Sequence, residues 1–280
     1  MKRFAKVMIA GAVIMGIGLA ILIAALAVGG GNFQDDYEIK TYECSEENVS
    51  LDIDFSIGKL DVDFYDGEKI KIEYPENKLL SASVKESSGK LSFKTDYRRK
   101  LNLFRWLRKI PATKIWIPQG PVMNVKINMD AGEAKFADGE YGDFNLYMNA
   151  GSFEMNDADC VTLSVTLNAG AVDMNSVSSV EDVKFQVNAG KIDIDSLNCP
   201  YVVTDVNAGD VSVDKMQVPK VDVDISAGSV KFGIVGNRAE YNILVDKSAG
   251  KCNISNQKGT MDKYINADIS AGSLNVDFES

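Results

Sequence analysis

The sequence predicts an all-β protein, a single-domain parallel β-solenoid with 19–22 residues per rung, preceded by one N-terminal transmembrane helix. Three observations lead to this prediction. An Ala-Gly pair recurs at nearly constant spacing through the C-terminal half of the 280-residue chain. Each repeat holds two stretches of alternating apolar and polar residues, the pattern of strands with one buried face. One apolar run near the N-terminus is long enough to cross a bilayer.

The apolar run covers residues 7–28 and contains no charged side chain. Basic residues precede it and acidic residues follow it, so residues 1–6 are expected in the cytoplasm and the rest of the chain outside. A cleavable signal peptide ending near Ala25-Leu26-Ala27 is the alternative, but the run exceeds the usual signal core of about 7 to 15 residues. We therefore expect a single-pass protein of the cell membrane, with a tether at residues 29–41 and an extracellular or periplasmic C-terminal domain.

The Ala-Gly pair marks a tight corner in each rung. Successive glycines are separated by 19, 19, 20, 19, 19, 22 and 22 residues, a spacing that indicates stacked structural repeats. Glycine adopts backbone angles that other residues reach only at a cost, and alanine is small enough for a tight bend. The predicted structural corner positions are Gly132, Gly151, Gly170, Gly190, Gly209, Gly228, Gly250 and Gly272.

Apolar residues stand two and four positions after each corner glycine, as Val172 and Met174 do after Gly170. If the rungs stack in parallel at about 4.8 Å, these positions form continuous hydrophobic columns inside a coil. The residue before each Ala-Gly pair is Asp, Asn or Ser, and stacked amides at this position are expected to hydrogen-bond along the coil. Parallel crossovers are usually right-handed, so we expect a right-handed coil.

The solenoid domain is expected to cover residues 42–280, with regular Ala-Gly rungs over 129–280 and longer, irregular rungs over 42–128. The sequence around Gly58 fits the repeat template well, and the sequence around Gly89 fits it less closely. The C-terminus is expected to stop in the middle of a rung. Phe278 and Glu279 would then lie at the open edge of the last strand.

The recurring [DNS]-A-G-x-φ-x-φ units resemble the bacterial putative-adhesin family of β-strand repeats, which includes the LiaG-like proteins. The strand Ile115-Trp116-Ile117-Pro118, which leads into Val125-Lys126-Ile127-Asn128, contributes to the resemblance. It covers nearly the whole exported region and implies a β-repeat fold in a protein of the cell envelope. Members of the family are often membrane-anchored. The family brings no established catalytic residues to this chain.

The composition argues against catalysis. The chain contains no histidine, which excludes Ser-His and Cys-His nucleophilic pairs and the commonest ligand of zinc, copper or iron. No glycine-rich phosphate loop precedes a helix, because the repeat glycines lie between strands. We expect no enzymatic activity, no catalytic residue, no cofactor and no bound metal.

Two carboxylate pairs are the strongest argument against this expectation. Asp173 and Asp193 occupy equivalent outward positions in neighbouring rungs, as do Asp205 and Asp224, and each pair would lie about 5 Å apart. Such pairs can bind a cation or act as an acid and a base. The short rungs leave no room for loops that would wall a cleft. A solvated face is therefore the preferred interpretation.

The segment from residue 97 to residue 110 contains six basic and no acidic residues, interleaved with Leu, Phe and Trp. This composition suits an anionic lipid surface or a polyanionic envelope polymer. Alternatively, the apolar residues of the segment cover the open N-terminal end of the coil as a cap. The candidate surface-binding residues are Arg98, Arg99, Lys100, Arg105, Trp106, Arg108 and Lys109.

The four cysteines, Cys44, Cys160, Cys199 and Cys252, are too few and too scattered for a disulfide scaffold, and we expect unpaired, buried or half-buried thiols. The net charge of −10 opposes binding to nucleic acid.

The function that fits these observations is binding rather than reaction. We expect a membrane-anchored extracellular β-solenoid that acts as an adhesin-like module or as an envelope scaffold or sensing module. Its partners would be the membrane that holds it and an envelope polymer, an anionic lipid or a membrane protein. Two alternatives remain, a carbohydrate-active enzyme on a β-helix and an accessory subunit of an envelope signalling or transport system.

Overall fold

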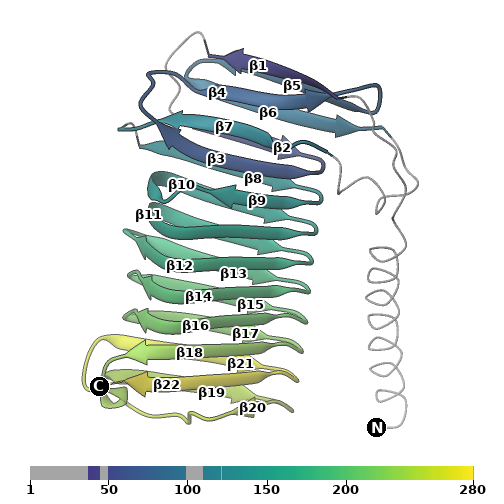
Figure 1. Cartoon of the computed structure of the whole chain (residues 1–280). Helices are drawn as coiled ribbons and strands as arrows, with labels where there is room; N and C mark the ends of the chain where they lie inside the picture. The colour runs from purple at the N-terminus through teal and green to yellow at the C-terminus, as the bar shows by residue number, and fades with distance from the viewer. Residues whose placement is uncertain (1–36, 45–49, 99–109, 121, 280) are drawn as a thin grey trace, which may run out of the picture.

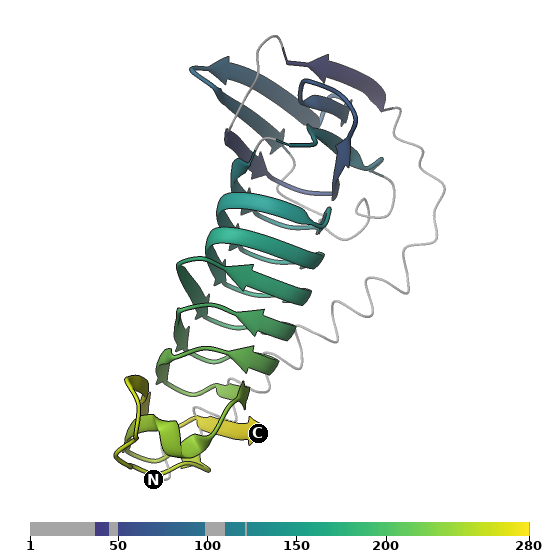
Figure 2. The same cartoon turned by 90° about the vertical axis from the view of Figure 1, so that its left-hand side faces the viewer.

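The computed structural model describes residues 37–44, 50–98, 110–120 and 122–279. They form 22 β-strands and one short 3-10 turn, which stack into a tall coil (Figure 1). The side view in Figure 2 shows that the strands lie in two facing layers. The prediction of an all-β fold is therefore confirmed for the described part of the chain.

Each layer is a stack of hydrogen-bonded strands, and β11 (Ser152–Leu167) bends and belongs to both layers. Layer A, in spatial order, consists of β1 (Glu38–Glu43), β4 (Lys71–Glu76), β7 (Thr113–Pro118), β3 (Lys59–Tyr65), β9 (Glu133–Phe136), β11, β12 (Ala171–Ser179), β14 (Lys191–Asn198), β16 (Asp210–Gln217), β18 (Ser229–Val235), β22 (Ser273–Glu279) and β20 (Lys251–Cys252). Layer B consists of β5 (Leu80–Ser87), β6 (Lys90–Tyr97), β2 (Ser50–Phe55), β8 (Met123–Met129), β10 (Gly139–Met148), β11, β13 (Asp182–Val187), β15 (Tyr201–Val206), β17 (Lys220–Ile225), β21 (Lys263–Ile269) and β19 (Tyr241–Lys247).

The hydrophobic core fills the space between the two layers. Neighbouring strands of the regular rungs pair in parallel and in register, so Val172 lies beside Ile192, and Ile192 lies beside Val211. These three side chains are at most 1% exposed. Each rung thus places an apolar side chain over the equivalent side chain of the next rung, and the predicted hydrophobic columns are confirmed. The right-handed sense of the coil stays a prediction.

The first rung, which consists of β2 and β3, does not lie at the N-terminal end of the coil. β2 lies between β8 and β6, and β3 lies between β9 and β7. Strands β4 to β7 follow this rung in the sequence and cover it on the outside. Gly58 is a true corner, because the backbone of Gly132 stacks directly on it.

The prediction of purely parallel rungs is wrong at this end. β4 pairs antiparallel with both β1 and β7, and β5 pairs antiparallel with β6. The sequence around Gly89 is the two-residue turn of the β5–β6 hairpin, with positive φ at Ser88 and Gly89, and not a corner. Positive φ at both positions matches the twist of a tight hairpin. Residues 38–41, which the sequence assigned to the tether, belong to β1.

The last two repeats are also stacked out of sequence order. β21 lies between β17 and β19, and β22 lies between β18 and β20. We call residues 263–279 the terminal rung and residues 241–252 the end rung. The terminal rung is inserted one rung inside the C-terminal end of the coil, and the end rung lies beyond it. On layer A, however, β20 pairs only with Ser273 and Leu274, so among the described residues no ladder covers the outer side of Phe278 and Glu279, as expected for an open edge.

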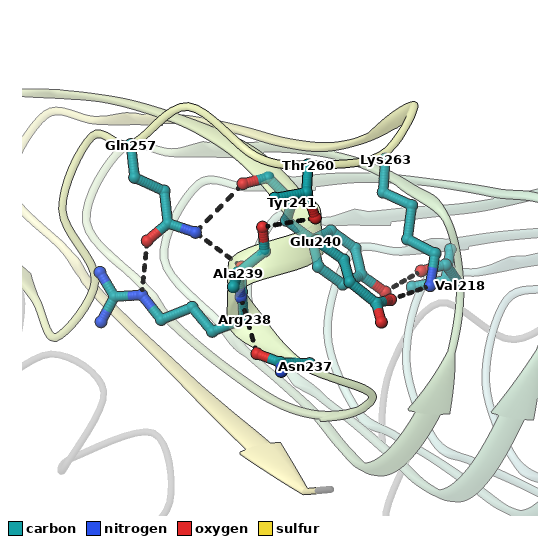
Figure 3. A network of polar contacts seen from close by, with 9 residues as sticks. All are labelled: Val218, Asn237, Arg238, Ala239, Glu240, Tyr241, Gln257, Thr260 and Lys263. Carbon is teal, nitrogen blue, oxygen red and sulfur yellow. Dashed lines mark hydrogen bonds and ion pairs between the residues drawn. The ribbon is translucent and has the colours of Figure 1, made fainter.

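The edge of the end rung is covered by polar contacts. The backbone N–H and C=O groups of Ile243 both pair with Gln257, and the N–H of Val245 donates to Oδ1 of Asn256 at 2.6 Å. Nε of Arg238, in the 3-10 turn η1 (Arg238–Glu240), donates to Oε1 of Gln257 at 3.2 Å (Figure 3). These contacts occupy edge groups that would otherwise invite another strand.

In the part of the chain that the structure describes, no helix has the length and apolar character needed to cross a membrane. The expected span at residues 7–28 and the stub at residues 1–6 lie outside the described residues.

Candidate functional site

The basic segment lies mostly outside the described residues, with Arg98 as the exception. The side chain of Arg98 is exposed, and its backbone N–H donates to the carbonyl of Leu79 at 2.9 Å. The candidates outside the described residues are Arg99, Lys100, Arg105, Trp106, Arg108 and Lys109. At the end of the segment, Ile110 is 7% exposed and packs against Ile57 and Leu80. The cap stays a prediction. Surface binding by this segment stays a prediction.

The corner glycines form a column along one edge of the coil. The first four, from Gly132 to Gly190, have φ between +122° and +152°, where other residues are strained. The last four, from Gly209 to Gly272, lie outside that range. A Cβ added at any of these four would still come within 2.5 Å of the backbone oxygen of the glycine stacked beside it. The close stacking of the corner backbones therefore requires glycine even at positions where the φ angle does not.

A ladder of side-chain amides runs beside this column. Nδ2 of Asn207 donates to Oδ1 of Asn188, and the same bond joins Asn188 to Asn168, Asn168 to Asn149, and Asn149 to Asp130, over 2.6–2.9 Å. All four bonds point the same way and end on the Asp130 carboxylate, which is a strong acceptor. The ladder satisfies polar groups at the corners, so we assign these residues a structural role.

Substituting Asn168 with alanine is expected to lower the free energy of unfolding by about 1–3 kcal/mol, because it leaves a donor of Asn188 and an acceptor of Asn149 without partners. Urea titration followed by circular dichroism measures the effect. The matched control is Asn156→Ala, an exposed residue with a single 3.2 Å bond to Asn175. Equal losses in the two variants would show that the ladder adds nothing.

The structure brings both predicted carboxylate pairs together, one on each layer. Asp173 lies beside Asp193 on layer A, and Asp205 lies beside Asp224 on layer B. On layer A, Nζ of Lys191 forms an ion pair with Asp193 at 2.5 Å. The layer B pair is part of a longer row, because Asp224 is followed by further carboxylates on the next two strands.

This row is the acidic column, formed by Asp205, Asp224, Asp268 and Asp246 on four neighbouring strands. Sequence analysis missed the last two members. All four stand four residues before their corner glycine, so the signal was present in the sequence. The sequence did not indicate the order of stacking, because the strand that carries Asp268 lies between the strands that carry Asp224 and Asp246.

The acidic column lines a groove of about 460 Å³ on the outer surface of layer B. Five aspartates line this groove, with Lys184 as the one basic residue among its lining side chains in the described part of the chain. Val203 and Leu244 add apolar surface, and Leu244 is 61% exposed. The groove thus combines strong negative charge with accessible apolar side chains.

Two tyrosines lie on the strands that form the groove. The rings of Tyr201 and Tyr264 are 6.5 Å apart between centroids. The hydroxyl of Tyr201 donates to Asp222, which also accepts a 2.8 Å hydrogen bond from Nδ2 of Asn266. These bonds hold the Asp222 carboxylate in place.

The acidic column is electrostatically strained. Burial raises the pKa of Asp224, and the charges of Asp205 and Asp268 raise it further. No group of three or more metal-ligating side chains occurs among the described residues, so the column is a row of separate carboxylates rather than a chelating cage. Cationic groups spaced along a larger ligand would relieve the repulsion.

Two smaller hollows lie on the same layer toward the N-terminal end. One of about 320 Å³ lies over β2, β5, β6 and β8, and one of about 140 Å³ lies over β8, β10 and β11. Lysine and aspartate side chains line the first, whereas mainly amides and hydroxyls, including Asn145 and Tyr147, line the second. Together with the groove, they follow layer B along the axis of the coil.

Three of the four cysteines are poorly placed for nucleophilic chemistry. All four are unpaired, and Cys44, Cys160 and Cys199 are buried while Cys252 is partly buried, as expected. Burial raises the pKa of each of the three buried thiols to about 12. These thiols are therefore protonated and poor nucleophiles at neutral pH.

Residues 49–280 match the model of the Toastrack DUF4097 family, which covers nearly all of the described coil. The chain belongs to this family. The resemblance to putative-adhesin β-repeat proteins that the sequence indicated is thereby confirmed. No curated protein matches this Toastrack chain.

Solved structures extend the comparison at the level of the fold. A putative adhesin from Bacteroides fragilis NCTC 9343 is 14% identical, with a TM-score of 0.52 over 88% of this chain and 100% of that chain. A putative cell adhesion protein from Clostridium sporogenes ATCC 15579 is 16% identical, with a TM-score of 0.27 over 87% of this chain and 100% of that chain. The first of these proteins shares the Toastrack fold described above.

Proposed function

We propose that this Toastrack chain is a non-catalytic, adhesin-like module, held outside the cell membrane by residues 7–28, and that its layer B binds an extended polymer of the cell envelope. The observation that carries the proposal is the row of hollows along layer B, which ends in the groove beside the acidic column. A polymer lying along the coil axis would meet an equivalent outward side chain at every rung, about 4.8 Å apart.

The groove indicates the chemistry of such a polymer. Five aspartates against one lysine favour a segment that carries protonated amines. Tyr147, which is 41% exposed, and Leu244 offer apolar surface to the faces of sugar rings. A glycan with free amino groups meets both requirements, and binding it requires no reaction.

The carbohydrate-active alternative receives less support. Asp205 and Asp224 are adjacent, and the raised pKa of Asp224 suits an acid. The groove nevertheless lies on the outer surface of the layer, where turns of two or three residues join β15 and β17 to their neighbours in the chain. Such turns build no wall around a substrate. A role as an accessory subunit remains compatible with the proposal, because a polymer-binding coil on an anchor can serve a membrane partner.

Replacing both Asp205 and Asp224 with asparagine is expected to weaken binding of an amine-bearing glycan by about tenfold, since two charge-assisted contacts are lost. The measurement is calorimetric titration of the full-length protein in detergent with a chitosan oligosaccharide. Its fully N-acetylated counterpart of equal length, which lacks the amines, should bind the unmodified protein more weakly.

The matched control is Asp173→Asn with Asp193→Asn, which removes the same charge from the neighbouring pair on layer A. This variant should change affinity by less than about twofold, because long-range charge alone contributes little at physiological salt. Equal losses from both double variants would mean diffuse attraction to an acidic protein. The proposed binding face would then be rejected.

A further inference from the structure

The terminal rung occupies a slot between two parts of the coil. Its strand β21 pairs with β17 on one side and with β19 on the other. Strand β22 pairs with β18 along its length and with β20 at Ser273 and Leu274. Among the described residues, β17 forms no ladder with β19, and β18 forms none with β20. The end rung is therefore joined to the coil largely through the terminal rung.

The walls of this slot are apolar and regular. Val221 of β17 and Ile243 of β19 both lie beside Ile265 of β21, and each of the three side chains is at most 3% exposed. On layer A, Val276 of β22 lies beside Phe232 of β18. Without the terminal rung, these walls would expose the facing edges of β17, β18, β19 and β20 and a strip of core.

Side chains reinforce the fit of the terminal rung. The amide of Asn253 pairs with both backbone groups of Val276, at 2.8 and 3.0 Å, and so continues the short strand β20. Nζ of Lys263 forms an ion pair with Glu240 at 2.6 Å and lies 5.3 Å from the ring centroid of Tyr241 (Figure 3). These contacts fix Val276 and Lys263 of the terminal rung in the slot.

The covalent link into the slot is long. Residues 253–262 join the end rung to the terminal rung, and ten residues can span about 33 Å when extended. In the structure, this hinge folds back on β19 through Asn256, Gln257 and Gly259. A second copy of the chain carries the same terminal rung and the same hinge, so it can offer the slot an identical occupant.

We propose that the terminal rung is exchangeable between copies during folding, so that residues 263–279 of one chain fill the slot of another and give a reciprocal dimer. The exchanged dimer keeps every ladder contact of the single chain, so concentration decides between the two forms. Exchange belongs to folding, because removing a rung that is paired on both sides of each strand requires the end of the coil to unfold.

The test uses two full-length variants that carry one new cysteine each, Lys251→Cys and Ser273→Cys, both with Cys252→Ser. Residues 251 and 273 are direct partners on β20 and β22, at a spacing of about 4.8 Å that a disulfide can bridge. The two variants are unfolded together in detergent, refolded under reducing conditions and then oxidised. A covalent heterodimer is expected, and its fraction should rise about tenfold for a tenfold increase in chain concentration while it is the minor species.

Three controls sharpen the result. Mixing the two variants after separate folding should give no heterodimer. Pairing Lys251→Cys with Lys191→Cys, at the first residue of β14 several rungs away, should also give none. A chain carrying both new cysteines should close an internal disulfide, which shows that the geometry permits the bond.

A second pair on layer B, Leu244→Cys with Asn266→Cys, repeats the measurement at β19 and β21. The proposal is overturned if chains carrying both cysteines of a pair close internally while co-refolded single variants yield no heterodimer at any concentration. It is also overturned if the Lys191→Cys control cross-links as well as Ser273→Cys does, because the contact would then be nonspecific.

Discussion

Replacing Gly170 with alanine is expected to lower the free energy of unfolding by about 3–5 kcal/mol. Two effects combine at this corner. The φ angle of Gly170 is +122°, where an L-residue is strained, and an added Cβ would lie 2.2 Å from the backbone oxygen of Gly151. That oxygen cannot move away freely, because it accepts the 2.9 Å hydrogen bond from the N–H of Ala171. Urea titration with circular dichroism measures the loss.

Gly120→Ala separates the two effects. Gly120 has a φ of +112°, but a Cβ added there would meet nothing within 4 Å. This variant should therefore cost only the backbone strain, about 1–2 kcal/mol. If both variants lost the same stability, stacking of the corner backbones would contribute nothing, and glycine would be needed only for its angles.

Phe153→Ala is expected to cost a similar amount, about 3–5 kcal/mol. Phe153 is fully buried, and its ring lies 5.4 Å from that of Phe136 and 5.9 Å from that of Phe144, between centroids. Its neighbours in the hydrophobic column are Ala134 and Val172, which are too small to fill the space that the ring would leave. A cavity would therefore remain inside the coil.

The unfolding midpoint in urea again measures the effect, and Val180→Ala provides the surface control. Val180 is 73% exposed, so its truncation should change stability by less than about 0.5 kcal/mol. A repeat architecture also predicts how the loss appears, because each rung depends on its neighbours. Hydrogen exchange should accelerate first in β9, β11 and β12. A uniform change along the whole coil would contradict that prediction.

The regular rungs were predictable because, in a parallel stack, the distance of a residue from its corner glycine decides which residues lie beside it. Once a corner glycine is located, every residue at the same distance from its own glycine falls into one column. Val172, Ile192 and Val211 illustrate this for the core, and Asn168 and Asn188 illustrate it for the amide ladder. The carboxylate pairs followed from the same rule, and the rule also contains the two members that were overlooked.

The two ends of the coil were not predictable by that rule. Alternation and corners describe the shape of one rung, but they do not state which rung lies beside it. All rungs present similar apolar columns, so several stacking orders bury similar surface. The contacts that distinguish these orders, such as those of Gln257 with Ile243 and of Asn253 with Val276, join residues without a repeated spacing.

The sequence by itself therefore determined the two-stranded rung, its corner glycine and the side chains of each column, because these depend on local backbone geometry and a period of two. The tertiary structure alone decided that the first and the last rung lie inside the ends of the coil, that antiparallel strands close the N-terminal end, and that Asp268 lies between Asp224 and Asp246 in the acidic column. Those outcomes follow from competition among strand edges for partners far away in the chain, where every unpaired backbone group is costly.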